Sequence, residues 1–172
     1  MKKIQTHLIG KTIFTNDSNA ITLYKKSSFG EPIDEKIQYS LSETLFLIKE
    51  RKIEVLFKNK ILSKNDILKK FQRIDKKIQI KYSVYKDLRE KGYVVKTALK
   101  FGADFRAYAK NTKPGSKHAK WIIFVDHETN KLTWQDFSSR NRVAHSTKKK
   151  LLLAIVDEES STTYYEVGWI KP

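Results

Sequence analysis

Cysteine is absent from the 172 residues of this sequence, which excludes disulfide bonds, thiolate metal sites and cysteine nucleophiles. The six glycines are scattered, and they form neither a GxGxxG nor a GxxxxGKS/T phosphate-binding loop. A GxSxG nucleophile elbow is missing as well. The sequence therefore argues against nucleotide-dependent chemistry and against hydrolysis by a cysteine or an elbow serine.

Long hydrophobic runs are also missing. The longest purely apolar run, LLLAIV at 151–156, falls far short of the ~20 residues that a membrane-spanning helix needs. Polar residues interrupt the charged N-terminal stretch, MKKIQTHLIGKT, before an apolar signal-peptide core can form. We therefore expect a cytoplasmic protein that is not associated with a membrane.

Acidic residues are few compared with basic ones. Lys and Arg total 35 against 19 Asp and Glu, which gives a formal net charge of +16. So large a surplus favours a polyanionic partner, and nucleic acid is the one that remains once a membrane is set aside. Apolar residues make up 40% of the chain and aromatic residues 12%, which excludes a disordered protein.

The hydrophobic pattern changes along the chain. Apolar residues recur at helical spacing over residues 78–91, and Gly92 is placed to end that helix. Short strands and helices alternate before it, whereas strand-like runs predominate beyond it, at 93–97, 104–108, 121–125, 151–156 and 164–167. With a charged stretch at 73–77 between the two parts, we predict a mixed α/β protein: a small N-terminal α/β domain over 1–76 and a C-terminal domain over 77–172 with helices on the faces of a sheet.

Capping residues predict further helices. Ser40 or Ser42 can cap a helix with an apolar face, and Ser63 opens another with an aspartate three residues later. Thr133 can cap a helix of about nine residues that ends near Asn141.

The histidines form no close metal-binding pair. His127 lies between Asp126 and Glu128, a group that could attract a divalent ion. A solvated turn between strands is the commoner explanation of such a segment, and we favour it.

A basic protein without a metal site can still cleave RNA, because the 2′-hydroxyl of RNA is a built-in nucleophile. The reaction needs a base for that proton, an acid for the leaving 5′-oxygen and a cation beside the phosphorane. Candidates are Tyr108 at the end of a strand, His118 after a Pro-Gly loop and Lys149 in a run of three lysines. Taken singly, each also has an ordinary explanation as a strand aromatic, a polar loop residue and a solvated charge.

Four ordered segments carry a resemblance to a known family. They are YKDLREKGYVVKT at 85–97, LKFGADFR at 99–106, PGSKHA at 114–119 and RVAHSTKKKL at 142–151. In this order they resemble the archaeal tRNA-splicing endonucleases, whereas the N-terminal part is similar only in the order of its segments. The resemblance implies a restriction-endonuclease-like C-terminal domain.

The resemblance further implies intron excision from precursor tRNA by metal-independent cleavage at a bulge–helix–bulge motif. The products of this lyase-type reaction would carry a 2′,3′-cyclic phosphate and a 5′-hydroxyl, and no cofactor is implied. It gives Tyr108 the role of general base, His118 that of general acid and Lys149 that of stabilising the transition state. A cationic neighbour such as Lys149 would favour the phenolate that a tyrosine base requires.

Two more residues are implied to grip the bulged bases. Arg142 occupies the position of a base-stacking arginine in its motif, and Trp169 takes the place of a second one by its distance from the chain end. Aromatic and guanidinium planes both stack on bases. A tryptophan packed into a terminal pair of strands is the other interpretation of Trp169.

The acidic turn Asp157, Glu158 and Glu159 stands where the family's acidic loop begins. That loop docks into a basic pocket on another subunit, which implies a dimer of dimers or a heterotetramer with a paralogous structural subunit. A solvated hairpin turn is the alternative, and Ser160 and Ser161 replace glycines that are common there.

Two other functions stay open. The family includes structural subunits that bind RNA without cleaving it, although the presence of Tyr108, His118 and Lys149 favours a catalytic chain. A metal-dependent nuclease of the same fold would need clustered carboxylates beside a lysine, and only Asp104 is available for such a set.

Overall fold

The structure of the chain is a computed structural model that describes residues 3–170. The chain divides between Tyr82 and Ser83 into two compact units. The division falls within a helix that the apolar periodicity predicts, α4 (Ile78–Glu90), and the predicted domain boundary after residue 76 stays a prediction. Across the described residues, no helix combines the length and the apolar character that crossing a membrane requires.

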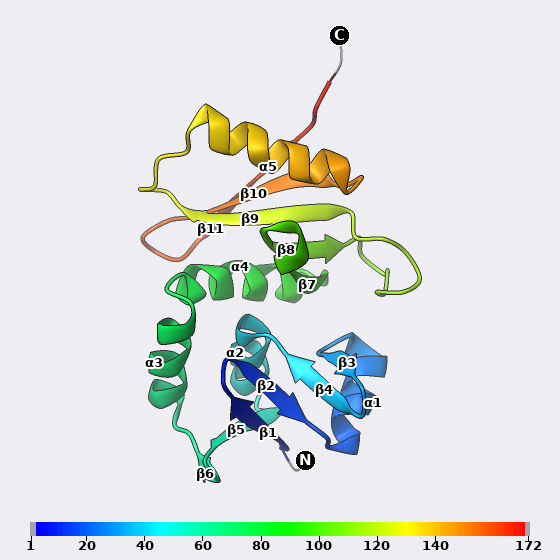
Figure 1. Cartoon of the computed structure of the whole chain (residues 1–172), viewed down its shortest axis with the longest axis vertical. Helices are drawn as coiled ribbons and strands as arrows, with labels where there is room; N and C mark the ends of the chain where they lie inside the picture. Colours follow the sequence, from blue (N-terminus) through cyan, green and yellow to red (C-terminus); the bar gives the residue numbers. More distant parts are fainter. Residues whose placement is uncertain (1–2, 171–172) are drawn as a thin grey trace. The chain divides into compact units, whose positions relative to one another are not determined.

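Six strands form one sheet in the N-terminal unit, in the order β3-β4-β2-β1-β5-β6 (Figure 1). β1 and β5 run parallel, and the other neighbouring pairs are antiparallel. The short strands β3, β4 and β6 are not predicted from the sequence, and β3 contains Pro32 at a sheet edge, where a missing amide proton is tolerated. The strands are β1 (Ile4–Ile9), β2 (Thr12–Thr15), β3 (Glu31–Ile33), β4 (Lys36–Tyr39), β5 (Ile53–Phe57) and β6 (Lys60–Ile61).

The helices of this unit begin at capping side chains. Asp17 accepts a hydrogen bond from the amide of the second residue of α1. Ser40, rather than Ser42, caps α2 and forms a capping box with Glu43. Ser63 caps α3 as predicted. The helices are α1 (Ser18–Ser27), α2 (Leu41–Lys49) and α3 (Lys64–Ile74).

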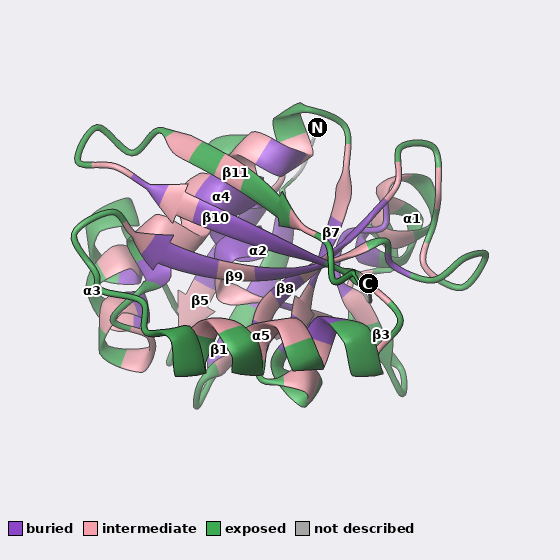
Figure 2. Cartoon of the chain, turned by 90° about the horizontal axis from the view of Figure 1, so that it is seen from above, coloured by how far each residue is buried: buried purple, intermediate pink, exposed green. Residues whose placement is uncertain are grey.

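Five strands form the C-terminal sheet, in the order β11-β10-β9-β8-β7. β9 and β10 run parallel and the other pairs are antiparallel, so the sheet is mixed. β9 and β10 come from the two continuous apolar runs, and most of their residues are buried (Figure 2). The strands are β7 (Val94–Ala98), β8 (Ala103–Tyr108), β9 (Trp121–His127), β10 (Lys150–Val156) and β11 (Thr162–Val167).

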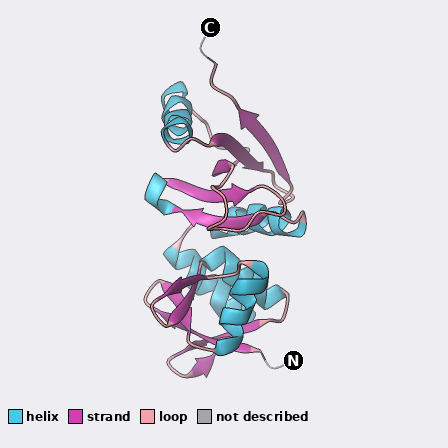
Figure 3. Cartoon of the chain, turned by 90° about the vertical axis from the view of Figure 1, so that its right-hand side faces the viewer, coloured by secondary structure: helices cyan, strands magenta, loops and turns pink. Residues whose placement is uncertain are grey.

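A helix covers each face of the C-terminal sheet (Figures 1 and 3). On one face, Tyr85 of α4 packs on Phe105 of β8, with 5.9 Å between the ring centroids. On the other face, Ala144 of α5 (Trp134–Ser146) and Ile122 of β9 belong to one buried hydrophobic cluster. The predicted mixed α/β fold, with a central sheet flanked by helices, is confirmed.

The helix α5 is longer than its sequence predicts. Thr133 caps it as expected, and Asp136 completes a capping box. The predicted end near Asn141 is wrong, because Ala144, which is only 2% exposed, packs against the sheet and holds the helix together as far as Ser146. The added turns bring the C-terminal end of α5 close to the start of β10.

Candidate active site

Two of the predicted catalytic residues, Tyr108 and Lys149, lie at one edge of the C-terminal sheet, the edge formed by the end of β8 and the starts of β9 and β10. Ala107 of β8 pairs with Trp121 of β9, and Trp121 pairs with Lys150 of β10. β8 therefore ends where β9 and β10 begin. Tyr108 follows Ala107 directly, and Lys149 directly precedes Lys150, so residues that lie 41 positions apart in the sequence are brought to the same edge.

Tyr108 and Lys149 also belong to the same face of the sheet. Arg106 pairs with Ile122, and Ile122 pairs with Leu151. Side chains alternate along a strand. Tyr108, two residues after Arg106, and Lys149, two residues before Leu151, therefore lie on the face that α5 covers.

The three lysines of the run 148–150 have different surroundings. Lys150 pairs with Glu166, whose carboxylate also accepts a hydrogen bond from the Trp121 indole at 2.7 Å. These bonds, that of Lys150 foremost, hold the pKa of Glu166 below its usual value. Lys148 is exposed. Lys149 is half-buried, and no carboxylate within residues 3–170 pairs with it, so its charge remains available to an anion close to the sheet.

The surroundings of Lys149 are apolar and cationic. Its Nζ donates to the carbonyl oxygen of Thr147 at 2.8 Å and lies 5.5 Å from the centroid of the Phe101 ring. Burial, followed by the charge of Arg106, lowers the pKa of Lys149. Arg106 thus adds a second positive charge on the face that carries Tyr108, and both cations favour the approach of a phosphate.

His118 lies in the loop that connects β8 with β9. The amide of Lys120 donates to the carbonyl of Ala107 at 2.8 Å and closes this loop. Gly115 adopts a φ of +92° within it, a conformation that favours glycine. The loop starts and ends at the edge that carries Tyr108, and the His118 side chain is exposed. A histidine on such a loop can reach a bound substrate without disturbing the sheet.

Arg142 and Trp169 are both exposed near the C-terminal part of α5. The Arg142 guanidinium donates to the Ser139 hydroxyl one turn earlier, at 3.2 Å. Trp169 is 60% exposed, and its ring meets that of His145 edge-on, with 4.1 Å between the centroids. Trp169 is therefore placed against the last turn of α5 with much of its surface open to solvent.

The acidic turn between β10 and β11 is built by Asp157. One oxygen of its carboxylate accepts from the amides of Glu159 and Ser161 at 3.0 and 2.8 Å. Ser160 adopts a φ of +64°, so a serine takes a conformation for which glycine is better suited. Asp157 thus stabilises the turn, whereas Glu158 and Glu159 are exposed.

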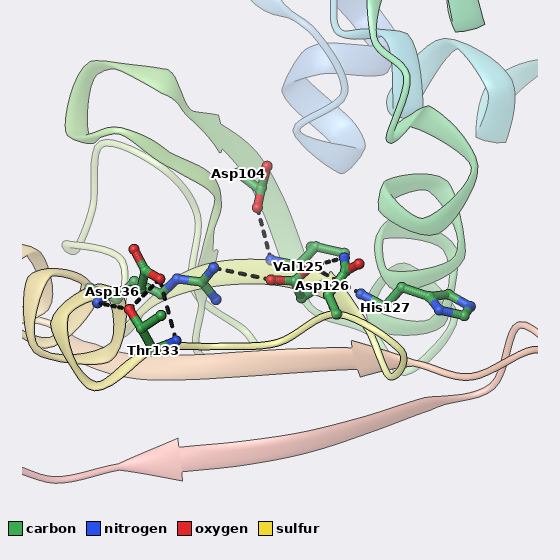
Figure 4. Close-up of polar contacts among 8 residues, drawn as sticks. Asp104, Val125, Asp126, His127, Thr133 and Asp136 are labelled. Carbon is green, nitrogen blue, oxygen red and sulfur yellow. Dashed lines mark hydrogen bonds and ion pairs between the residues drawn. The ribbon is translucent and has the colours of Figure 1, made fainter.

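The segment 126–130, which comprises the end of β9 and the turn after it, is only partly solvated. Asp126 is 8% exposed; its carboxylate accepts from the Arg140 guanidinium of α5 at 3.1 Å and from the Asn130 amide group at 2.5 Å (Figure 4). The interpretation of the segment as a solvated turn is therefore wrong for Asp126, because its ion pair joins α5 to β9. Glu128 and the residues up to Asn130 are exposed.

Asp104 does not belong to a group of carboxylates. One of its oxygens accepts from the amide of Val125 at 2.8 Å on the neighbouring strand (Figure 4). Within residues 3–170, no three His, Asp or Glu side chains are grouped so that they could hold a metal ion.

A mixed sheet with a helix on each face, and with a tyrosine, a histidine loop and cations at one edge, is suited to phosphodiester cleavage and defines a nuclease-like domain. The family model described as the catalytic C-terminal domain of tRNA intron endonuclease matches residues 78–164. The model described as the N-terminal domain of the same enzyme matches residues 4–68, so the similarity extends over both units.

Archaeal proteins are similar to the whole chain. The tRNA-splicing endonuclease of Pyrococcus abyssi is 42% identical, over 99% of each chain. That of Thermococcus kodakarensis is 40% identical, over 96% of this chain and 97% of the relative. That of Methanothermobacter thermautotrophicus is 36% identical, over 95% and 96%. The chain belongs to the tRNA intron endonuclease family and is an RNA endonuclease, which confirms the resemblance.

Two residues at this edge are not singled out by the sequence alone. Arg106 lies in the motif around β8, two residues before Tyr108, and strand alternation was the signal that could have found it. His145 lies four residues before Lys149, within RVAHSTKKKL. Its contact with Trp169 requires the segment after β11 to lie beside α5, and no local sequence pattern indicates this arrangement.

Proposed function

We propose that this chain excises introns from precursor tRNA by cleaving the RNA at a bulge–helix–bulge motif, without a metal ion. The observation that carries the proposal is the arrangement of Tyr108 and Lys149 on one face at one sheet edge, beside the loop of His118. These are the residue types that transfer of a phosphoryl group to the 2′-hydroxyl requires.

The reaction proceeds by attack of the 2′-hydroxyl on the adjacent phosphorus. Tyr108, as its phenolate, takes the hydroxyl proton while the new O2′–P bond forms. His118, as its imidazolium, gives a proton to the leaving 5′-oxygen while the P–O5′ bond breaks. The products are a 2′,3′-cyclic phosphate and a 5′-hydroxyl, so charge and protons balance and no water is consumed.

Lys149 stabilises the negative charge that builds up on the non-bridging oxygens. A half-buried ammonium with no carboxylate partner in the described part of the chain interacts more strongly with such a charge than a solvated one would. Arg106 lies near enough to lower the pKa of Lys149.

Arg142 and Trp169 hold the bulged bases. Both side chains are exposed, and each offers a flat surface on which a base can stack. The edge contact of His145 restricts the Trp169 indole, so less of its motion is lost when a base binds.

The exposed Glu158 and Glu159 assemble the enzyme by docking on a cationic surface of another subunit. They are concentrated acidic residues in a chain of net charge +16, which makes an intermolecular ion pair favourable. The assembly is a dimer of dimers of this chain or a heterotetramer with a paralogous structural subunit. The mass of the protein expressed alone, measured together with its activity, separates the two.

Cleavage of an intron-containing precursor tRNA in excess EDTA tests the proposed reaction. The expected fragments carry 5′-hydroxyls that polynucleotide kinase labels directly, and 3′ ends that resist phosphatase until acid opens the cyclic phosphate. Fragments with 5′-phosphates, or activity that EDTA abolishes, would indicate the metal-dependent reaction. RNA binding without cleavage would indicate a structural subunit.

A further inference from the structure

Residues 58–77 carry an unusual concentration of positive charge. They contain eight Lys and Arg but two Asp, a net +6, which is more than a third of the net +16 of the chain. Both carboxylates have local partners: Asp66 accepts from the Ser63 hydroxyl at 2.6 Å, and Asp75 pairs with Lys81 at 2.7 Å. Asp75 is thus paired with a lysine outside the segment, and the net +6 already counts both acids.

The cations of α3 face away from the core of the N-terminal unit. The helix buries Ile67 and Phe71, which are 2% and 0% exposed. Lys69 and Arg73 lie on the opposite side, one turn apart, and are exposed. Lys76 follows just beyond the end of the helix and is exposed as well.

Arg73 lies in the last turn of α3, where a positive charge is favourable, but the stability of the fold does not account for the pattern as a whole. Like charges four residues apart, as in Lys69 and Arg73, destabilise a helix, and no carboxylate within residues 3–170 pairs with either of them. Lys60 on the edge strand β6 protects that edge from pairing with another strand, but the cations of α3 lie on no sheet edge. A polyanionic ligand explains why they are there.

Cation–π contacts with one phenylalanine ring join α3 to the hairpin turn between β5 and β6. The Lys70 ammonium lies 3.8 Å from the centroid of the Phe57 ring, and that of Lys58 lies 5.7 Å from it. The cations of α3 and those of the turn between β5 and β6 thus form one surface. We call it the α3 cationic surface; it consists of Lys58, Lys60, Lys64, Lys69, Lys70, Arg73 and Lys76.

We propose that the α3 cationic surface is a second RNA-binding site, which holds the phosphate backbone regardless of base sequence. A membrane is the poorer ligand, because the apolar side of α3 is buried in the protein and has nothing to insert into lipid. The inference takes RNA as the ligand from the proposed function but needs neither the cleavage reaction nor the bulge.

Two triple variants of the full chain test this site. Lys69→Gln, Arg73→Gln and Lys76→Gln together remove three charges from the α3 cationic surface. The matched control replaces the exposed Lys11, Lys26 and Lys36 with Gln. It removes the same charge from the same unit but outside α3 and β6: Lys11 lies in the turn between β1 and β2, Lys26 in α1 and Lys36 in β4.

The measurement is the affinity for RNA as a function of salt, with a precursor tRNA and with an unrelated RNA duplex that has no bulge. Three lost phosphate contacts are expected to reduce the slope of log K against log salt by about 2 to 3. Affinity at low salt should fall at least about tenfold on both RNAs, from the same loss of contacts. The control variant should show less than half of each change.

Equal effects of the two variants would overturn the proposal, because net charge alone would then explain the binding. The proposal would also be overturned if the Lys69, Arg73 and Lys76 variant kept the salt slope of RNA binding and had a lower mass in light scattering. The surface would then bind the acidic turn of another copy of the chain. Failure of the proposed function would give a different result, because the wild type would then leave precursor tRNA intact. The salt dependence of binding to the bulge-free duplex, compared between the two triple variants, would still show whether the α3 cationic surface binds RNA.

Discussion

Replacement of Lys149 by methionine tests the catalytic site at the position where the structure makes the sharpest distinction. Methionine is one atom shorter than lysine, but it fills much of the same half-buried space and removes the terminal ammonium together with its charge. The hydrogen bond from Nζ to the Thr147 carbonyl is lost, but so is the repulsion from Arg106. The variant should therefore fold normally and cleave slowly.

The size of the effect follows from the position of the ammonium. A unit charge about 4 Å from a developing negative charge, at an effective dielectric constant of about 20, contributes about 4 kcal/mol. Part of this is already gained in the ground state, where the phosphate carries a negative charge. Loss of a single stabilising donor typically slows catalysis by about 10²–10³-fold. We expect a decrease in the cleavage rate constant within that range.

The assay is single-turnover cleavage of a precursor tRNA at saturating enzyme, so that the rate constant reports the chemical step. Lys148→Met is the matched control, because it removes the same charge one residue away from an exposed side chain. It should change the rate less than about threefold, as expected for a solvated charge. Equal losses in the two variants would refute the role given to Lys149.

The pH dependence of stability gives a second measurement on the same pair of proteins. The pKa of Lys149 is lowered in the folded chain from its usual 10.5. Between the two pKa values the unfolded chain binds more protons, so the wild type gains stability as the pH rises through that window. The methionine variant lacks this gain. The difference in free energy of unfolding, variant minus wild type, should therefore be largest at a pH below the pKa of Lys149 in the folded chain. It should decrease as the pH rises towards 10.5. A difference that does not change with pH would contradict a lowered pKa of Lys149.

Other replacements separate catalysis, base gripping and assembly. Tyr108→Phe or His118→Ala should each slow cleavage about a hundredfold or more and leave the affinity for precursor tRNA unchanged; normal turnover in either variant would remove its assigned role. Arg142→Ala should weaken binding of a bulged RNA by about 1–3 kcal/mol, the contribution of one stacked base. It should have little effect on binding of a bulge-free duplex, and equal effects on the two RNAs would argue against base gripping. Glu158→Lys with Glu159→Lys should lower the mass found by light scattering, whereas an intact assembly would exclude docking through this turn.

Local sequence patterns predicted much of the secondary structure, because helix caps and turns are stabilised by residues close to one another in the sequence. Ser63 and Thr133 cap helices through hydrogen bonds to amides three residues later, and the sequence shows both partners. Gly92 ends α4 with a φ of +90°, a conformation that favours glycine. The strands β3 and β4 lacked such a signal, since short strands depend on the neighbours that pair with them.

The extent of α5 and the position of Trp169 depended on distant parts of the chain. The last turns of α5 are held by burial of Ala144 against the sheet, and the capping signal at the other end of the helix contains no information about it. Trp169 lies against His145 because β11 returns antiparallel to β10. Asp126 is buried near the end of β9, where Arg140 reaches it from α5, so the acidic segment 126–128 could not be interpreted from its composition.

By itself, the sequence determined a large positive charge, the absence of thiols and the resemblance to a family, and it supplied the tyrosine, the histidine and the lysine for which we predict roles in RNA cleavage. Only the tertiary structure decided the surroundings of each lysine in the run, among which the resemblance had already pointed to Lys149. Lys150 is neutralised by Glu166, while Lys149 lies half-buried on the face of Tyr108. The reason is that strand pairing and alternation assign neighbouring residues to opposite faces of a sheet, so equal side chains one position apart meet different charges.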